Sequence, residues 1–253
     1  MEKSYEYRFE LKPGKHVFIP TREGMKRGQS IVSTLTKNWM PREFFYHFQK
    51  RGGHVAALRP HVDQQFKSSV DLTNFFPSVT RTKVHRSLKS IGYANRYALD
   101  VASESCVEFE GRKFLPYGFI QSMALATLVV EKSLLGQKIS EIRASGGIVT
   151  MYVDDILVSG EDFNTVKKQY DEIVLAATES GFAVSEGKLS PPDTSVRAFN
   201  CELSNGEIRV LDARMGKFAD DGLNSGDATK DAILRYVGVL NEEQRKFLNS
   251  IFF

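Results

Sequence analysis

The sequence has little cysteine and no grouping of histidines, and both shortages narrow the classes of protein to which it can belong. Among its 253 residues only Cys106 and Cys201 are cysteines, and they do not stand at metal-ligand spacing. A disulfide scaffold and a zinc site are therefore not expected. The five histidines form no constellation that would support a nucleophilic mechanism.

A long apolar run is also missing. No stretch approaches the ~20 apolar residues that span a bilayer, and the charged beginning Met1–Arg8 is unlike a signal peptide. We therefore expect a cytoplasmic protein that does not contact a membrane. The composition, 42% hydrophobic and 26% charged, is that of an ordinary globular protein with one or two subdomains.

Acidic residues are scarce at the N-terminal end. Residues 1–60 hold twelve Lys and Arg against five Glu and no Asp, a balance of +7 within a chain whose net charge is +3. A basic region beside an acidic one suits a nucleic-acid enzyme, because phosphates need neutralising while carboxylates bind metal. A chance bias of a solvated surface is the alternative interpretation.

Two adjacent carboxylates interrupt a pair of apolar segments. Asp154 and Asp155 lie between 147–151 and 156–158, a pattern that predicts a β-hairpin with both acids at its tip. Carboxylates are hard ligands that suit Mg²⁺ or Mn²⁺. An isolated Asp-Asp pair is also common in solvated turns.

A third carboxylate lies upstream. The segment 69–78 reads as a strand that carries Asp71 and is stopped by Pro77-Ser78. Opposite the Asp-Asp tip in the same sheet, Asp71 would complete a set able to hold two metal ions with substrate phosphates. Three such carboxylates would support polymerase chemistry.

Three motifs stand in order along the chain: Asp71 followed by Phe75–Ser78, then Leu115–Ser122, then Tyr152–Asp155. This set resembles the motifs of prokaryotic reverse transcriptases, the branch that holds retron, group II intron and abortive-infection or defence-associated enzymes. The resemblance implies an α+β, right-hand fold with fingers and palm, and the C-terminal segment departs from the family, so the thumb is expected to be much reduced or absent. It implies an N-terminal element and basic fingers at 1–60, a palm at 61–215 with a fingers portion around 80–115, and a linker with short helices at 216–253.

The resemblance also implies an activity, RNA-directed DNA synthesis from dNTPs, with two Mg²⁺ or Mn²⁺ ions. Its partners would be an RNA template or structured RNA, the DNA product, and a protein partner or second copy in place of the thumb. The residues carried over are these: Asp71, Asp154, Asp155 and Lys188 for catalysis; Asp71, Leu72, Asp154 and Asp155 for metal; Lys50, Arg51, Arg59, Phe76, Tyr117 and Gly118 for the nucleotide; Tyr152, Phe199, Asn200 and Cys201 for the primer.

Some of these roles rest on simple chemistry. Phe76 takes the place of the aromatic residue that excludes a ribose 2′-hydroxyl, although a core Phe is the alternative. Lys188 would act as general acid or stabilise charge on the leaving pyrophosphate, or it is a plain surface residue. Arg side chains in the fingers would chelate phosphate oxygens, and Lys would act as a point charge.

The chain departs from the family pattern at two places. Tyr117 replaces the usual glutamine, an amide that contacts the incoming nucleotide, so fidelity or nucleotide preference is expected to differ. The Val-Thr-Gly motif of retron enzymes is absent, which argues against a retron proper. In the family that the chain resembles, divergence at the Tyr117 position is more frequent among abortive-infection and defence enzymes, which favours a role in antiviral defence. Untemplated or protein-primed synthesis and a non-catalytic RNA-binding scaffold are the alternative functions.

Hydrophobic periodicity and turn residues predict the remaining elements. The predicted elements are strands at 5–11 and 16–19, a basic-tipped hairpin over 44–59, helices over 80–92, 122–135 and 162–180, and a hairpin that joins 199–203 to 207–210.

The C-terminal segment is expected to hold a polar linker at 220–226 and helices at 227–239 and 241–253. Asn241 and Gln244 would form a capping box. Two helices are fewer than the usual three of a thumb. The apolar end around Phe247 and Phe253 is either a docking patch or packs back on the palm.

Overall fold

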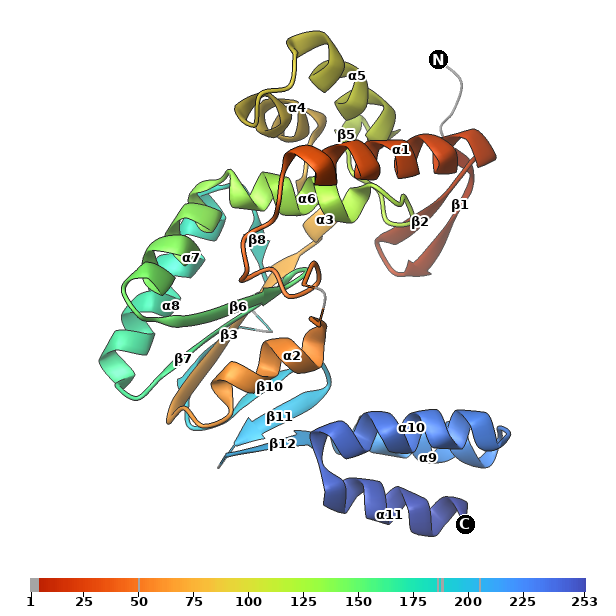
Figure 1. Ribbon diagram of the computed structural model, residues 1–253, viewed down its shortest axis with the longest axis vertical. Helices are drawn as coiled ribbons and strands as arrows, with labels where there is room; N and C mark the ends of the chain where they lie inside the picture. The colour runs from red at the N-terminus through yellow and green to blue at the C-terminus, as the bar shows by residue number, and fades with distance from the viewer. Residues whose placement is uncertain (1–4, 50, 186, 188, 205) are drawn as a thin grey trace. The chain divides into compact units, whose positions relative to one another are not determined.

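The computed structural model describes residues 5–49, 51–185, 187, 189–204 and 206–253 (Figure 1). They form two units. Unit 1 comprises Met1–Phe45, Asp71–Ala144 and Glu172–Glu186, and unit 2 comprises Tyr46–Val70, Ser145–Asp171 and Gly187–Phe253. Helices and strands both contribute to each unit, which confirms the α+β class.

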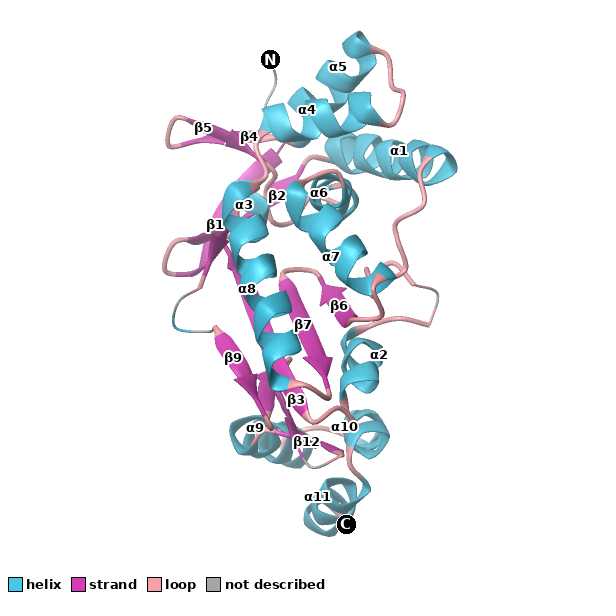
Figure 2. Cartoon of the chain, turned by 90° about the vertical axis from the view of Figure 1, so that its left-hand side faces the viewer, coloured by secondary structure: helices cyan, strands magenta, loops and turns pink. Residues whose placement is uncertain are grey.

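Helices dominate unit 1, and two small hairpins accompany them (Figure 2). Its elements are β1 (Tyr5–Lys12), β2 (Lys15–Pro20), α1 (Arg22–Asn38), α3 (Phe75–Ser78), α4 (Arg81–Ser90), α5 (Asn95–Ser105), β4 (Val107–Phe109), β5 (Arg112–Phe114), α6 (Ser122–Glu131), α7 (Leu134–Ala144) and β8 (Ala183–Val184). Helix α4 packs against α5 and α6. The strands predicted at 5–11 and 16–19 are confirmed as the antiparallel pair β1 and β2.

The helix predicted over 80–92 is confirmed as α4, and Thr80 caps it by accepting from the Lys83 amide at 3.3 Å. The prediction of a single helix over 122–135 is wrong, because the helix is interrupted between the end of α6 at Glu131 and the start of α7 at Leu134. In the first turn of α7, a Cβ on Gly136 would lie 2.3 Å from the Val130 carbonyl oxygen of α6. Only glycine permits that backbone approach, so Gly136 allows α7 to begin close against the end of α6.

Strand β3 (Phe66–Thr73) and helix α8 (Phe163–Glu179) each contribute residues to both units. Residues 66–70 of β3 belong to unit 2, and Asp71–Thr73 belong to unit 1, where Leu72 and Thr73 pair with β8. After β3, Asn74 adopts a left-handed φ of 49° and the short helix α3 follows. The predicted helix over 162–180 is confirmed as α8.

Two sheets build unit 2. Its elements are α2 (His54–Leu58), the 3-10 turn η1 (Arg59–His61), β6 (Ile148–Tyr152), β7 (Asp155–Gly160), β9 (Ser190–Asp193), β10 (Val196–Ala198), β11 (Cys201–Ser204), β12 (Glu207–Val210), α9 (Asp212–Leu223), α10 (Asp227–Leu240) and α11 (Glu242–Phe252). In one sheet β7 lies between β6 and β3, and β9 pairs with β3. The other sheet has the order β10-β11-β12, and the hairpin predicted before and after Gly206 is confirmed by β11 and β12.

The basic-tipped hairpin predicted over 44–59 is wrong. Residues His54–Leu58 form helix α2 instead, which starts after Gly53 at a φ of 105°. The run His-Val-Ala-Ala-Leu carries Ala and Leu, good helix formers, and Ala57 and Leu58 are fully buried. Burial of this apolar face outweighs the weak strand pattern.

The C-terminal segment contains three helices rather than a linker and two helices (Figure 1). Helix α9 occupies most of the predicted linker, and the three helices pack on one another. Leu248 and Phe252 are buried in one core with Cys201 and Val210 of the β10-β11-β12 sheet, whereas Phe247 and Phe253 stay exposed. The shortage of thumb-like helices that was expected is therefore not found.

The capping box predicted at α11 is half correct. Asn241 Oδ1 accepts from the Gln244 amide at 3.0 Å, as expected of an N-cap. The Gln244 side chain does not reach back to Asn241. Its Oε1 accepts from the Val210 amide and its Nε2 donates to the Val210 carbonyl, both at 2.8 Å, so it pairs with strand β12.

Candidate active site

The hairpin of β6 and β7 holds the two adjacent carboxylates, as predicted. Tyr152 pairs with Asp155 across the hairpin, and Val153 and Asp154 connect the strands. Val153 has a φ of 61°. A β-branched residue in the left-handed region costs about 1–3 kcal/mol, so this turn is strained and the structure around it must hold it.

A histidine holds this turn. The Val153 amide donates to His47 Nδ1 at 3.0 Å, and the imidazole packs edge-on against the Tyr152 ring at 6.0 Å. Burial lowers the pKa of His47 to about 4, against the opposing effect of a hydrogen bond with the Met151 backbone. The ring is therefore neutral near pH 7 and keeps a lone pair for the amide. No sequence motif marks this residue, and it was not predicted.

Aromatic rings surround Tyr152 within unit 2. The His54 ring lies 5.9 Å from Tyr152 and 6.0 Å from Phe199, and Tyr152 and Phe199 meet edge-on at 5.5 Å. His54 Nε2 also lies 2.9 Å from the Tyr236 hydroxyl of α10. Two of the residues predicted to contact the primer, Tyr152 and Phe199, are thus brought together.

The other two predicted primer residues differ in exposure. Asn200 is exposed in the turn between β10 and β11, and its carbonyl accepts from the Leu211 amide at 2.9 Å. Cys201 is fully buried, and that burial raises the pKa of its thiol to about 11. Burial likewise raises the pKa of Tyr236, its hydrogen-bond partner, to about 12. The Cys201 side chain therefore serves the core.

The nucleotide residues carried over from the family lie partly together in unit 1. Phe76 is buried, with 8% of its surface exposed, and its ring meets Tyr117 edge-on at 4.9 Å. Lys15 Nζ lies over the Tyr117 ring at 4.3 Å. Next to Tyr117, Gly118 has a φ of 100°, and a Cβ there would lie 2.3 Å from the Phe18 carbonyl oxygen. Glycine is required at that position by the backbone alone.

Asp71 and Leu72 lie near the end of β3. The Asp71 carbonyl accepts from the Ser185 amide at 3.0 Å, and its side chain is half-buried. The Leu72 side chain is buried, so only its backbone could contact a metal ion.

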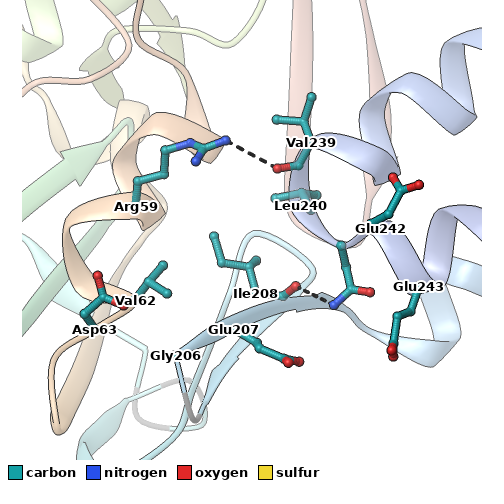
Figure 3. A pocket seen from close by; sticks show the side chains of 11 residues that line it. Arg59, Val62, Asp63, Gly206, Glu207, Ile208, Val239, Leu240, Glu242 and Glu243 are labelled. Atoms are coloured by element: carbon teal, nitrogen blue, oxygen red, sulfur yellow. Dashed lines mark hydrogen bonds between the residues drawn. The ribbon is translucent and has the colours of Figure 1, made fainter.

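The predicted basic residues of the fingers have different surroundings. Arg51 is exposed in a turn, and Lys50 and Lys188 lie outside the described residues. Arg59 donates to the Val239 carbonyl at 3.3 Å and lines a cavity of about 460 Å³ with the acidic residues Asp63, Glu207, Glu242 and Glu243 (Figure 3). This contact with α10 differs from the triphosphate contact predicted for Arg59, which stays a prediction.

The three side chains predicted to bind metal are all carboxylates. Asp71 belongs to unit 1, and Asp154 and Asp155 belong to unit 2. Among the residues that the structure describes, no three His, Cys, Asp or Glu side chains form a group that could hold a metal ion. Carboxylates on a tight turn are nonetheless the oxygen donors that Mg²⁺ and Mn²⁺ prefer, so the chemistry of the donors fits these ions.

Similarity to solved structures identifies the class of fold. The chain matches the RNA-dependent RNA polymerase of BmCPV at elongation state with a TM-score of 0.54 and 13% identity, covering 94% of this chain and 25% of that one. It matches a foamy viral protease-reverse transcriptase in complex with dsDNA with a TM-score of 0.50 and 19% identity, covering 90% and 40%. The fold is that of nucleic-acid polymerases.

The family is narrower than the fold. The model of the family "Reverse transcriptase (RNA-dependent DNA polymerase)" matches residues 11–197, so the chain belongs to this family. It is 27% identical over 197 residues to the Retron Ec86 reverse transcriptase of Escherichia coli, covering 77% of this chain and 60% of that relative. It is 28% identical over 213 residues to the Retron Mx65 reverse transcriptase of Myxococcus xanthus, covering 75% and 49%.

These relatives confirm the predicted resemblance to prokaryotic reverse transcriptases, and both are retron enzymes, the group against which the absence of Val-Thr-Gly had argued. The chain spans about half to three fifths of their length. Within the described residues, none of the helices has both the length and the apolar character that crossing a membrane requires.

Proposed function

We propose that the chain is an RNA-directed DNA polymerase that extends a primer 3′-hydroxyl with dNTPs. The observation that carries this proposal is the strained β6–β7 turn, which presents Asp154 and Asp155 in a chain of the reverse transcriptase family. The pair Tyr152 and Phe199 beside it supports a site for the primer end, because aromatic faces stack on bases at about 1–3 kcal/mol per base.

Asp71, Asp154 and Asp155, with the Leu72 backbone, would hold two Mg²⁺ or Mn²⁺ ions. When bound, the two ions stabilise the attacking and leaving oxygens of a phosphoryl transfer. The chain's own contribution is to fix the carboxylates. The β6–β7 pairing fixes Asp155, and the Ser185 amide fixes the backbone at Asp71.

The nucleotide would be bound by unit 1 residues. Phe76 is held edge-on against Tyr117, so its ring has little freedom to move away from a sugar hydroxyl. Gly118 brings backbone close to its neighbours without a side chain. Arg51 is exposed and free of the core to meet phosphates, and Lys50 and Lys188 are assigned by the family resemblance alone.

The partners follow from this reaction. The template would be RNA, and the basic N-terminal segment suits its phosphates. The three helices α9, α10 and α11 supply a layer beside the β10-β11-β12 sheet, so a partner protein or second copy is not needed to replace missing helices. A role in antiviral defence, expected from the sequence resemblance, stays a prediction.

A single set of reactions tests the proposal. The pure protein is incubated with Mg²⁺ and either dNTPs or NTPs, with and without an RNA template and primer, beside Asp154→Ala. We expect extension with dNTPs only when template and primer are present, and none with Asp154→Ala. Product without template would instead support untemplated synthesis. Absence of product under every condition, with a biological activity that survives Asp154→Ala, would support the non-catalytic scaffold.

Phe76→Val should raise the use of NTPs relative to dNTPs by about 10- to 100-fold, because the smaller side chain leaves room for a 2′-hydroxyl. The measurement is kcat/KM for one matched dNTP and NTP pair. Phe44→Leu is the control, since Phe44 is 2% exposed and its ring lies 4.3 Å from that of Phe45 in the core. If the Phe76 variant and the unmodified chain show the same selectivity between dNTP and NTP, Phe76 does not contact the sugar.

A further inference from the structure

The connection between β6 and β7 needs support from outside the hairpin. Val153 lies in the left-handed region at a φ of 61°, a conformation that a β-branched side chain disfavours. It directly precedes Asp154, so its backbone angles set the direction in which the first carboxylate leaves the turn. If Val153 relaxed to an ordinary conformation, Asp154 would move.

The support comes from His47. Its Nδ1 accepts from the Val153 amide at 3.0 Å, which satisfies a backbone donor in the connection. The imidazole is neutral near pH 7 because burial lowers its pKa to about 4, so Nδ1 has a lone pair to offer. The ring also lies edge-on to the ring of Tyr152, the residue that directly precedes Val153 in the chain.

The segment that carries His47 is itself fixed. The Tyr46 amide donates to the Met151 carbonyl of β6 at 2.9 Å, and the Gly53 amide donates to the Tyr46 carbonyl at 2.9 Å. A Cβ on Gly52 would lie 1.8 Å from the Tyr46 carbonyl oxygen, so this loop closes tightly over Tyr46. The residue before His47 is therefore anchored both to β6 and to its own loop.

We propose that His47 is a positioning residue for the two carboxylates: its Nδ1 holds the Val153 amide and keeps the connection in the left-handed conformation that places Asp154 and Asp155. This inference rests on the proposed function for its effect on activity. The contact itself is independent of what the enzyme copies.

Two substitutions of His47 separate the hydrogen bond from the bulk of the ring. His47→Leu removes the acceptor and should lower kcat for dNTP addition by about 10- to 100-fold, the usual cost of losing a group that orients a metal-binding residue. The KM for dNTP should stay unchanged, because the positioning role assigns His47 to the β6–β7 connection and not to the nucleotide. His47→Asn places an amide oxygen near the position of Nδ1 and should restore most of kcat.

A substitution of Val153 tests whether backbone strain is the reason that loss of the His47 hydrogen bond lowers kcat. Val153→Gly lets the backbone adopt a positive φ without the steric cost. In that background the additional loss from His47→Leu should be smaller than in the unmodified chain. His85→Leu is the matched control, since His85 lies on α4 and bonds with Asn95, and its kcat should equal that of the unmodified chain. Equal losses for His47→Leu and His47→Asn, or the same loss with and without Val153→Gly, would overturn the proposal.

A readout without catalysis distinguishes failure of this inference from failure of the proposed function. Hydrogen exchange of the Val153 amide should be faster in His47→Leu than in the unmodified chain and close to normal in His47→Asn. If the unmodified chain makes no DNA but the exchange rates follow this order, the proposed function fails and the positioning role stands. If exchange at Val153 is unaffected by His47→Leu, the positioning role fails regardless of activity.

Discussion

Asp71→Asn is expected to lower dNTP incorporation by about 10³-fold, equivalent to about 4 kcal/mol of transition-state stabilisation. The amide keeps the shape of the side chain but removes the charge that would hold a divalent ion. The backbone should not change, because the Asp71 carbonyl bonds with the Ser185 amide and Leu72 continues the pairing with β8. The measurement is single-nucleotide extension of a primed RNA template, with thermal unfolding recorded in parallel.

Asp221→Asn is the control for this experiment. Asp221 is an exposed residue of α9, so loss of its charge should leave both extension and the unfolding temperature unchanged. Asp71→Asn should match the unmodified chain in stability and differ in activity. Wild-type rates in Asp71→Asn would show that this carboxylate does not hold the metal.

Gly118→Ala should destabilise unit 1 by about 3 kcal/mol and lower its unfolding temperature by about 6–12 °C. Two costs add at this residue. The φ of 100° disfavours any side chain, and the new Cβ would meet the Phe18 carbonyl oxygen at 2.3 Å. That oxygen is part of the backbone and cannot rotate away. The measurement is calorimetry of the purified variant.

Gly14→Ala separates the two costs. Gly14 also has a positive φ, 75°, in the turn between β1 and β2, but a Cβ there meets nothing within 4 Å. Its destabilisation should reach only about 1–2 kcal/mol, the cost of the left-handed backbone. Equal effects of the two substitutions would mean that the chain around Phe18 relaxes and that contact with the backbone oxygen is not the main cost.

Sequence patterns correctly predicted the elements that are specified by residues close together in the chain. The β1–β2 and β11–β12 hairpins and helices α4 and α8 were predicted correctly, because alternation, caps and turn glycines specify them within a short stretch. The Asp154–Asp155 hairpin was predicted for the same reason. The three motifs then gave the family, which the comparison confirms.

Elements that depend on distant contacts were not predicted. Helix α9 contains Asp220 and Asp221, which resemble a linker, but Met215 and Phe218 of the same helix are buried in the core of unit 2. His47 could not be found either, since only folding brings residue 47 to residue 153. The roles of the site residues stay predictions, because they concern ligands rather than the fold.

Gln244 connects helix α11 to the β10-β11-β12 sheet, and Phe199 lies in the turn between β10 and β11 of that sheet. Its side chain holds both the amide and the carbonyl of Val210, so α11 is tied to β12 through two hydrogen bonds and a common core. A displacement of α11 must therefore carry β12 with it or break both bonds, at about 1–3 kcal/mol for each buried group left unpaired. Release of a bound duplex by movement of these helices would then also shift the neighbouring residues proposed to contact the primer.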